Sequence, residues 1–213
     1  MAILKGCIFD IDGTLADSMG IWGDIDRAFL EKRSITMPDD YIDALNSMSF
    51  SQAAEYTIKR FSLDESPEAI MNEWKAMSEY AYAHTIKLKE GVPEFLEKLK
   101  DEGIPMIAAT DLERKPAESV LSSNGILGYF TAVLTTKETG RDKSHPDIFL
   151  EAASRLGDAP ERIAVFEDML TPLVTARSLG FITIGVYDAS CPESKESMSA
   201  VSDRYIMSFK ELL

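Results

Sequence analysis

Short, nearly continuous apolar runs recur along the chain, and segments with a helical pattern separate them. Runs of four to seven apolar residues suit β-strands that are buried on both faces. The sequence therefore predicts a sheet covered on both sides, with strands at residues 3–9, 104–109, 163–166 and 181–186 and a weaker one at 130–134.

Helical patterns with start and stop signals lie between these strands. Most begin near a proline and most close on a glycine, as helices commonly do. They cover residues 93–102, 116–123, 147–156 and 172–179, the last with Thr171 as its N-cap and Pro172 in its first turn. Because strand and helix alternate, we expect an α/β fold with a doubly wound parallel sheet.

One long segment interrupts this alternation, because residues 16–87 carry amphipathic helical patterns without a convincing strand. The helices are expected at residues 19–32, 40–46, 51–60 and 67–82. We expect two domains: a core of residues 1–15 and 88–213, and a smaller α-helical cap domain of residues 16–87 inserted after the first strand. We expect a hinge at the two connections between them.

The charge balance narrows the possible partners. Lys and Arg number 22 and Asp and Glu 36, so the net charge is −14, which repels a nucleic-acid backbone. No run approaches the about 18 apolar residues of a membrane span, and the first run meets Asp10 too soon for a signal peptide. Cys7 and Cys191 are far apart and suit a reducing compartment. We expect a cytoplasmic protein without nucleic-acid or membrane partners; its oligomeric state does not follow from the sequence.

Polar residues follow several of the predicted strands. Asp10 and Asp12 follow the first strand, Thr110 the second, and Glu167 with Asp168 the fourth in chain order. The carboxyl ends of parallel strands form the ligand-binding edge of such a sheet. Any one of these side chains could simply begin a turn, but together they predict a site.

The predicted acidic residues need a counter-charge. At about 4 Å, two like charges repel by about 1 kcal/mol in water and by about 4 kcal/mol at an effective dielectric constant of about 20. A cation is therefore expected among Asp10, Asp12, Glu167 and Asp168. All are hard oxygen ligands, which favours Mg²⁺ over zinc or copper. In extended backbone Asp10 and Asp12 point to the same side, where one can act as nucleophile and the other as acid and base.

Four ordered motifs resemble those of a known family. They are Asp-Ile-Asp-Gly-Thr-Leu-Ala-Asp-Ser at residues 10–18, Thr110 at the end of an apolar strand, Lys143 shortly before Pro-Asp-Ile-Phe at 146–149, and Glu-Asp at 167–168. The chain resembles the haloacid dehalogenase superfamily of phosphohydrolases over nearly its whole length. Within it, the chain is similar to the branch of beta-phosphoglucomutase and phosphoglycolate phosphatase.

The resemblance implies a role for each matched residue. Asp10 attacks phosphorus and becomes an aspartyl phosphate, while Asp12 protonates the leaving oxygen and then activates water. The implied Mg²⁺ is held by the Asp10 carboxylate, the Asp12 carbonyl and Asp168, with Glu167 nearby or bound. The implied phosphate-binding residues are Thr110, Lys143, Asp111 and, through loop N–H groups, Gly13.

The sequence departs from the family pattern at a few supporting positions. The branch commonly has Ser after its acidic pair and Gly three positions later, where this chain has Met169 and Pro172. Asp111 stands where Asn is more usual, and Ser144 where Pro is. Loss of a small hydroxyl beside Asp168 removes an expected hydrogen bond to that ligand, so we expect altered efficiency or substrate preference.

The same residues separate the reactions of the superfamily. Asp12 supplies the proton that a phosphate ester needs, which disfavours dehalogenation and phosphonate cleavage. Mutases of this branch have a cap-loop Arg for the second phosphate, and residues 45–51 contain none. We therefore expect a Mg²⁺-dependent phosphatase of a small phosphorylated metabolite, such as a sugar phosphate. The alternatives are a beta-phosphoglucomutase and, because of Met169 and Pro172, a protein that binds phosphometabolites without turnover.

Overall fold

The computed structural model describes residues 4–45, 48–191 and 193–213. The chain divides into two compact units, Met1–Met19 with Ile86–Leu213 (unit 1) and Gly20–Thr85 (unit 2). The expected first and last cap residues, 16 and 87, lie within unit 1. Ala16 belongs there because it forms isolated β-bridges with both Asp12 and Leu88.

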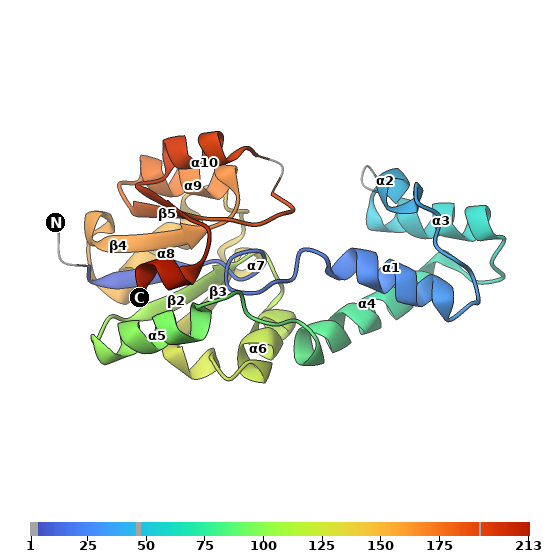
Figure 1. Ribbon diagram of the computed structural model, residues 1–213, viewed down its shortest axis with the longest axis horizontal. Helices are drawn as coiled ribbons and strands as arrows, with labels where there is room; N and C mark the ends of the chain where they lie inside the picture. Colours follow the sequence, from blue (N-terminus) through green and yellow to red (C-terminus); the bar gives the residue numbers. More distant parts are fainter. Residues whose placement is uncertain (1–3, 46–47, 192) are drawn as a thin grey trace. The chain divides into compact units, whose positions relative to one another are not determined.

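Unit 1 is built on one parallel sheet. Its strands are β1 (Gly6–Phe9), β2 (Met106–Thr110), β3 (Phe130–Thr135), β4 (Ile163–Glu167), β5 (Ile182–Val186) and β6 (Arg204–Ile206). They lie in the order β3-β2-β1-β4-β5-β6, and every pairing is parallel. The blue strand β1 therefore lies between green β2 and orange β4 (Figure 1). The predicted fold class is confirmed, and each of the five apolar runs overlaps one strand.

The sixth strand is absent from the sequence-based expectation. Arg204–Ile206 has three residues, of which only Ile206 is buried. A strand this short at the edge of a sheet has no apolar run to mark it. The Ser- and Glu-rich segment before it forms α10 (Lys195–Val201).

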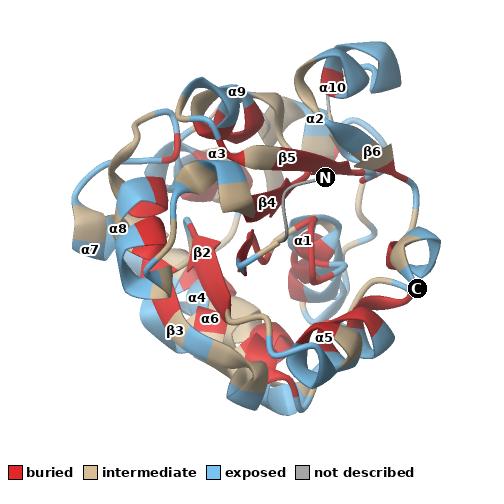
Figure 2. Ribbon diagram, turned by 90° about the vertical axis from the view of Figure 1, so that its left-hand side faces the viewer, coloured by how far each residue is buried: buried red, intermediate tan, exposed pale blue. Residues whose placement is uncertain are grey.

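Helices cover the sheet on both faces. They are α5 (Val92–Asp101), α6 (Arg114–Ser123), α7 (Thr136–Thr139), α8 (Asp147–Leu156) and α9 (Leu170–Ser178), with short 3₁₀ turns at Leu127–Tyr129, Pro160–Arg162 and Phe209–Leu212. In Figure 2 the strands β2 and β4 are red and buried, whereas the outer sides of the helices are pale blue and exposed.

Alternate strand residues enter two different cores. On one face, Phe149 of α8 packs in a cluster with Ile8 and Val165. On the other face, the rings of Phe9 and Phe166 stack with centroids 4.4 Å apart. Successive strand residues point to opposite faces, so both positions are apolar. This is the physical origin of the continuous apolar runs in the sequence.

The start of α9 differs from the expectation. Helix α9 begins at Leu170, and Met169 takes the extended N-cap conformation without a side-chain hydrogen bond. Thr171 is therefore not the N-cap, because the chain turns into the helix two residues earlier. Pro172 is the third helical residue, still within the first turn, where a missing N–H costs nothing.

Two chain segments run antiparallel where unit 1 connects to unit 2. The Asp17 N–H donates to the Lys87 carbonyl at 2.9 Å, and the Lys89 N–H donates to the Leu15 carbonyl at 2.9 Å. The Lys89 ammonium also lies 2.7 Å from the Asp188 carboxylate in the loop after β5. These contacts tie both connections to unit 1.

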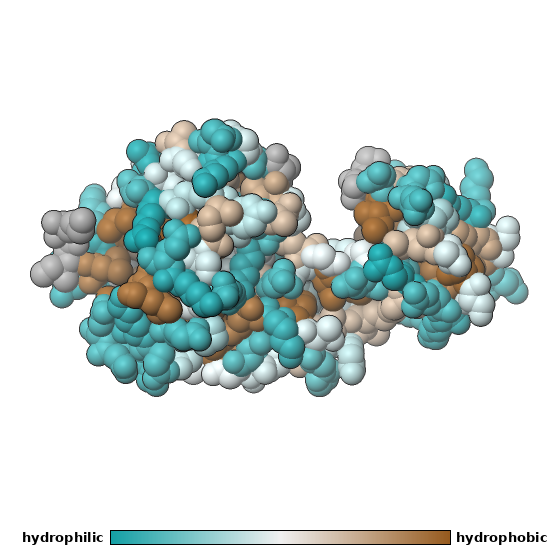
Figure 3. Space-filling model, in the orientation of Figure 1, coloured by the Kyte–Doolittle hydropathy of each residue, from teal (hydrophilic) through white to brown (hydrophobic). Residues whose placement is uncertain are grey.

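The visible surface is mostly hydrophilic. In Figure 3 the apolar residues, drawn in brown, form separate patches between teal hydrophilic residues. This agrees with the excess of acidic residues in the chain. Among the described residues, no helix is both long and apolar enough to span a bilayer.

Unit 2 is entirely helical in its described part. Its helices are α1 (Ile21–Glu31), α2 (Tyr41–Leu45), α3 (Phe50–Phe61) and α4 (Pro67–His84). The rings of Phe29 and Trp74, both buried, lie 5.4 Å apart between α1 and α4. Arg33, which follows α1, forms an ion pair with Glu73 of α4, and its guanidinium lies 2.6 Å from the Glu73 carboxylate.

One carboxyl group of unit 2 is buried at a cost that depends on pH. Burial raises the pKa of Asp26 from its ordinary value of 3.8 to about 6. The folded state therefore favours the protonated form of Asp26. The contribution of this preference to the free energy of unfolding is full below about pH 4 and is lost as the pH rises through about 6. We expect Asp26→Asn to increase the free energy of unfolding by about 1–2 kcal/mol at about pH 7.5, after allowance for nearby solvent.

Urea unfolding of Asp26→Asn and the parent protein at two pH values tests this expectation. At about pH 3 the gain should nearly vanish, because this pH lies below both the ordinary pKa of 3.8 and the raised pKa of about 6, so Asp26 is largely protonated in both states of the parent protein. A gain of the same size at both pH values would mean that burial of the charge is not its cause.

Candidate functional site

The register of the sheet brings three predicted residues to one edge. Phe9 pairs with Phe166 of β4 and with Ala108 of β2. Asp10, the residue after Phe9, therefore lies level with Glu167 on one side and one residue short of Thr110 on the other. All three side chains are buried.

Lys143 reaches this edge from the loop between α7 and α8. Its ammonium forms an ion pair with the Asp10 carboxylate and donates to Glu167 Oε2 at 2.9 Å. The Lys143 side chain is only 3% exposed. A lysine buried to this degree is held by its carboxylate partners, since an unpaired charge would be costly there.

Asp168 is held differently. The Thr14 hydroxyl donates to Asp168 Oδ1 at 2.9 Å. Asp168 Oδ2 is buried and has no hydrogen-bond partner among the described residues. A Cβ atom placed on Gly13, whose φ is +75°, would lie 2.2 Å from this Oδ2. Glycine is therefore required at position 13 both by its backbone conformation and by the carboxylate beside it.

Asp10, Glu167 and Asp168 form one buried acidic group. Each offers a carboxylate oxygen, and these oxygens lie within 4.8 Å of one another. Burial raises the pKa of Asp10 and Glu167, and it raises that of Asp168 to about 7. Burial alone would lower the pKa of Lys143, but the charges of Asp10 and Glu167 hold it above its ordinary value.

In their ionised forms the three carboxylates outnumber the one ammonium that pairs with them. Asp168 Oδ2 also lacks a donor in the described part of the chain. An orphaned, buried carboxylate oxygen is the kind of atom that a metal ion satisfies. Because the donors are carboxylate oxygens, the residues present fit a hard divalent cation such as Mg²⁺.

Asp12 lies apart from the acidic group. Its side chain is half-buried and accepts a hydrogen bond from the hydroxyl of Ser18, itself buried. Its backbone forms a β-bridge with Ala16 in the loop after β1. Of the four acidic side chains expected to cluster, three therefore have carboxylate oxygens within 4.8 Å of one another. The fourth, Asp12, is hydrogen-bonded to Ser18 instead.

The predicted phosphate-binding residues differ in what they offer. Thr110 Oγ1 accepts the Leu112 N–H at 3.1 Å, which uses an oxygen lone pair and not the hydroxyl hydrogen. The Gly13 N–H donates to the Ala16 carbonyl at 3.0 Å, so this N–H is already hydrogen-bonded within its own loop. Asp111 is exposed, and its negative charge contributes to raising the pKa of Asp10.

Two contacts of the site were not expected from the sequence. Thr14 and Ser18 belong to the motif at residues 10–18, but nothing local indicates that their hydroxyls bind Asp168 and Asp12. The sequence signal that could have indicated these contacts is the motif itself, because Thr14 and Ser18 both follow Asp10 and Asp12 in it. Met169 stands where the family commonly has a Ser hydroxyl. Its backbone N–H donates a long hydrogen bond, of 3.4 Å, to Glu167 Oε1.

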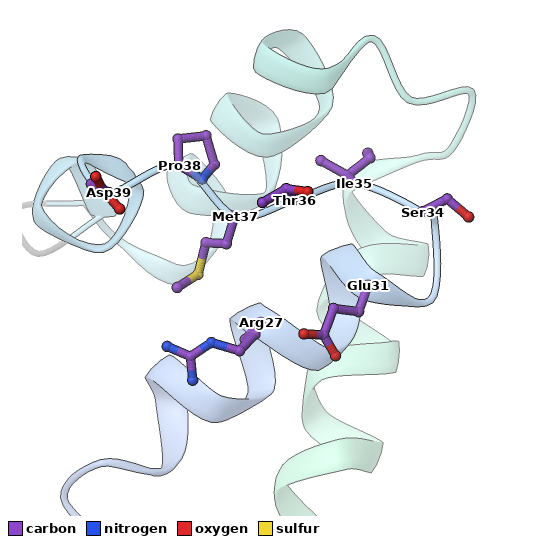
Figure 4. A pocket seen from close by; sticks show the side chains of 8 residues that line it. All are labelled: Arg27, Glu31, Ser34, Ile35, Thr36, Met37, Pro38 and Asp39. Atoms are coloured by element: carbon purple, nitrogen blue, oxygen red, sulfur yellow. The ribbon is translucent and has the colours of Figure 1, made fainter.

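A cavity of about 510 Å³ in unit 2 is a different feature (Figure 4). Arg27 and Glu31 of α1 line one wall, and residues 34–39 line the other. None of the predicted catalytic residues lines it.

Comparison with known proteins gives the family context of this site. A family model described as haloacid dehalogenase-like hydrolase matches residues 4–180. The bifunctional riboflavin kinase/FMN phosphatase of Arabidopsis thaliana is 28% identical over 86% of this chain, but the chain spans only about half of that protein, 48% of its length.

Two further relatives are similar over nearly their full length. The fructose-1-phosphate phosphatase YqaB of Escherichia coli K12 is 28% identical over 85% of this chain and 95% of its own. A crystal structure of a Thermotoga maritima protein assigned as a beta-phosphoglucomutase superposes with a TM-score of 0.87, at 23% identity, over 99% of this chain and 97% of its own. The structural likeness extends to the whole fold.

Proposed function

The chain belongs to the haloacid dehalogenase-like hydrolases, and from this premise we propose that it is a metal-dependent phosphatase acting on a small phosphorylated sugar. The observation that carries the proposal is the buried group of Asp10, Glu167 and Asp168, with Lys143 paired to the first two. Such a group at the carboxyl ends of parallel strands suits the transfer of a negatively charged phosphoryl group.

Asp10 is the proposed nucleophile. One of its carboxylate oxygens forms a bond to phosphorus while the bond from phosphorus to the ester oxygen breaks, which yields an aspartyl phosphate and an alkoxide leaving group. Lys143, in contact with Asp10, offsets negative charge on the transferring group. Thr110 is proposed to donate its hydroxyl hydrogen to a phosphoryl oxygen.

Asp12 is the proposed general acid and base. It gives its proton to the leaving oxygen, and the resulting carboxylate then takes a proton from water as that water attacks phosphorus. The bond between Asp10 and phosphorus breaks, inorganic phosphate leaves, and Asp12 is protonated again. Ser18, which donates to Asp12, holds its carboxylate in one orientation.

A divalent cation completes the proposed site. We propose that the Asp10 and Asp168 carboxylates and the Asp12 carbonyl hold Mg²⁺, with Glu167 bound or close by. When bound, the ion neutralises phosphoryl charge and orients the ester for in-line attack. The support is the orphaned Asp168 Oδ2 and the all-oxygen donor set.

The substrate class rests on the named relatives. One is a fructose-1-phosphate phosphatase and another, from Thermotoga maritima, is a phosphorylated carbohydrates phosphatase. A phosphorylated sugar is therefore the first substrate class to test. Binding without turnover is disfavoured because Asp10, Asp12, Thr110 and Lys143 are all retained.

A beta-phosphoglucomutase is the second candidate. The structural likeness to a protein assigned to that activity concerns the fold, at 23% identity. The cap stretch at residues 45–51, where mutases carry an Arg, has none in the sequence, and residues 46–47 lie outside the described part of the chain. Hydrolysis therefore remains the favoured reaction.

Metal-dependent phosphate release is the experiment that tests the proposal. The purified protein is expected to release phosphate from a panel of sugar phosphates in Mg²⁺, to lose at least about 100-fold of this rate in excess EDTA, and to recover it when Mg²⁺ is restored. The mutase is tested in parallel by conversion of beta-glucose 1-phosphate to glucose 6-phosphate with the bisphosphate primer. No phosphate release from any member of the panel would falsify the proposal.

A further inference from the structure

The side chain that donates to the carboxylate of Asp168 comes from the loop that follows β1 and not from a neighbour in sequence. Met169, the next residue along the chain, has no hydrogen-bond donor in its side chain. Instead, the hydroxyl of Thr14, 154 positions away, donates to Asp168 Oδ1 at 2.9 Å. Thr14 is fully buried and Asp168 nearly so, so solvent cannot replace this bond.

The two oxygens of Asp168 have different surroundings. Oδ1 accepts from Thr14, whereas Oδ2 is buried without a hydrogen-bond partner among the described residues. Gly13 lies against Oδ2 so closely that a Cβ atom would meet it at 2.2 Å. The Asp168 carboxylate is thus confined on one side by Gly13 and fixed at one oxygen by Thr14.

The other two acids of the group have a charged partner of their own. Asp10 and Glu167 both form ion pairs with Lys143. Asp168 has a neutral hydroxyl in the corresponding role, so no ammonium or guanidinium among the described residues is paired with its carboxylate. A neutral donor can therefore orient this carboxylate without competing with a cation for it.

We propose that Thr14 is a positioning residue that fixes Asp168 Oδ1 so that Oδ2 is kept as the ligand atom for the divalent cation. This inference rests on the proposed function, since it concerns the same cation site. In this role Thr14 touches neither the substrate nor the reacting atoms, and it acts through Asp168 alone.

Two substitutions at position 14 separate this role from simple packing. Thr14→Val keeps the shape of the side chain and removes the hydroxyl, whereas Thr14→Ser keeps the hydroxyl and removes the methyl group. Loss of a hydrogen bond to a metal ligand typically weakens metal binding about 10–100-fold. We expect Thr14→Val to raise the Mg²⁺ dissociation constant by this factor and Thr14→Ser to stay within about threefold of the parent protein.

The Mg²⁺ dissociation constant is measured by calorimetric titration of the intact protein without substrate, and independently from the shift of the melting temperature with Mg²⁺ concentration. Thr57→Val is the matched control. It removes another fully buried hydroxyl, which bonds Tyr41 and the Ala53 carbonyl in unit 2. The control should lose stability but keep the Mg²⁺ affinity of the parent protein.

The outcomes distinguish the inference from the proposed function. If the parent protein neither binds Mg²⁺ nor releases phosphate, the proposed function fails. If the parent protein does both and Thr14→Val binds Mg²⁺ as tightly, Thr14 is not a positioning residue although the function stands. The packing explanation predicts the reverse ranking, with Thr14→Ser weaker than Thr14→Val, and that ranking would overturn the inference.

Discussion

Asp10→Asn is expected to lower phosphate release at least about 10⁴-fold while the fold is retained. The amide has nearly the same shape as the carboxylate but cannot attack phosphorus. Burial raises the pKa of Asp10, which shows that its charged form is disfavoured in this environment. A neutral amide at this position is therefore tolerated, and activity falls much further than stability.

Intact-mass measurement separates loss of the nucleophile from loss of folding. The parent protein, quenched during turnover, should carry one added phosphoryl group that hydroxylamine removes, as expected of an acyl phosphate, and Asp10→Asn should carry none. Asp24→Asn makes the same chemical change at a side chain that is 74% exposed in unit 2, and it should leave phosphate release unchanged. Retention of more than about a tenth of the parental rate in Asp10→Asn would exclude Asp10 as nucleophile.

Lys143→Met is expected to lower both stability and activity. Removing the ammonium leaves the Asp10 and Glu167 carboxylates buried without the cation that pairs with both. Breaking a buried ion pair by deleting one partner costs about 3–5 kcal/mol. We expect a loss of this size in the free energy of urea unfolding at about pH 7.5 without added metal, and at least about a 10³-fold loss of phosphate release.

A second lysine and a double substitution serve as controls for Lys143→Met. Lys137 pairs with Glu113 on the surface, with a side chain 71% exposed, so Lys137→Met should change the free energy of unfolding by no more than about 0.5 kcal/mol. Adding Asp10→Asn to Lys143→Met removes one of the two stranded charges and should restore about 1–3 kcal/mol. If Lys143→Met is as stable as the parent protein, the Lys143 ammonium does not stabilise the buried Asp10 and Glu167 carboxylates.

The local pattern was sufficient for most of the secondary structure. Ile8 and Phe9 are both apolar because one packs toward α8 and the other stacks on Phe166. A central parallel strand must satisfy two cores and therefore shows a continuous apolar run. The edge strand β6 has no such requirement at Arg204, and for this reason it escaped detection. The start of α9 was misplaced because Met169 adopts the N-cap conformation without a capping side chain.

The motif at residues 10–18 was also sufficient to predict which residues are candidates for catalysis. Asp10, Asp12 and Gly13 follow a buried strand directly, and the adjacent acids Glu167 and Asp168 follow another. What the motif could not indicate was how the acids differ. Asp10 and Glu167 share a lysine, Asp168 takes a hydroxyl from Thr14, and Asp12 takes one from Ser18.

The sequence by itself determined the kinds of residue at the site and their place at strand ends, because hydrophobic periodicity and turn residues act over a few neighbouring positions. Only the tertiary structure decided which partners meet. Lys143 lies 133 positions from Asp10, and Thr14 lies 154 positions from Asp168. Such contacts depend on the order and register of β1, β2 and β4 and on the packing of the loops between them. These are properties of the whole folded unit, since they arise from burying all of its apolar faces together.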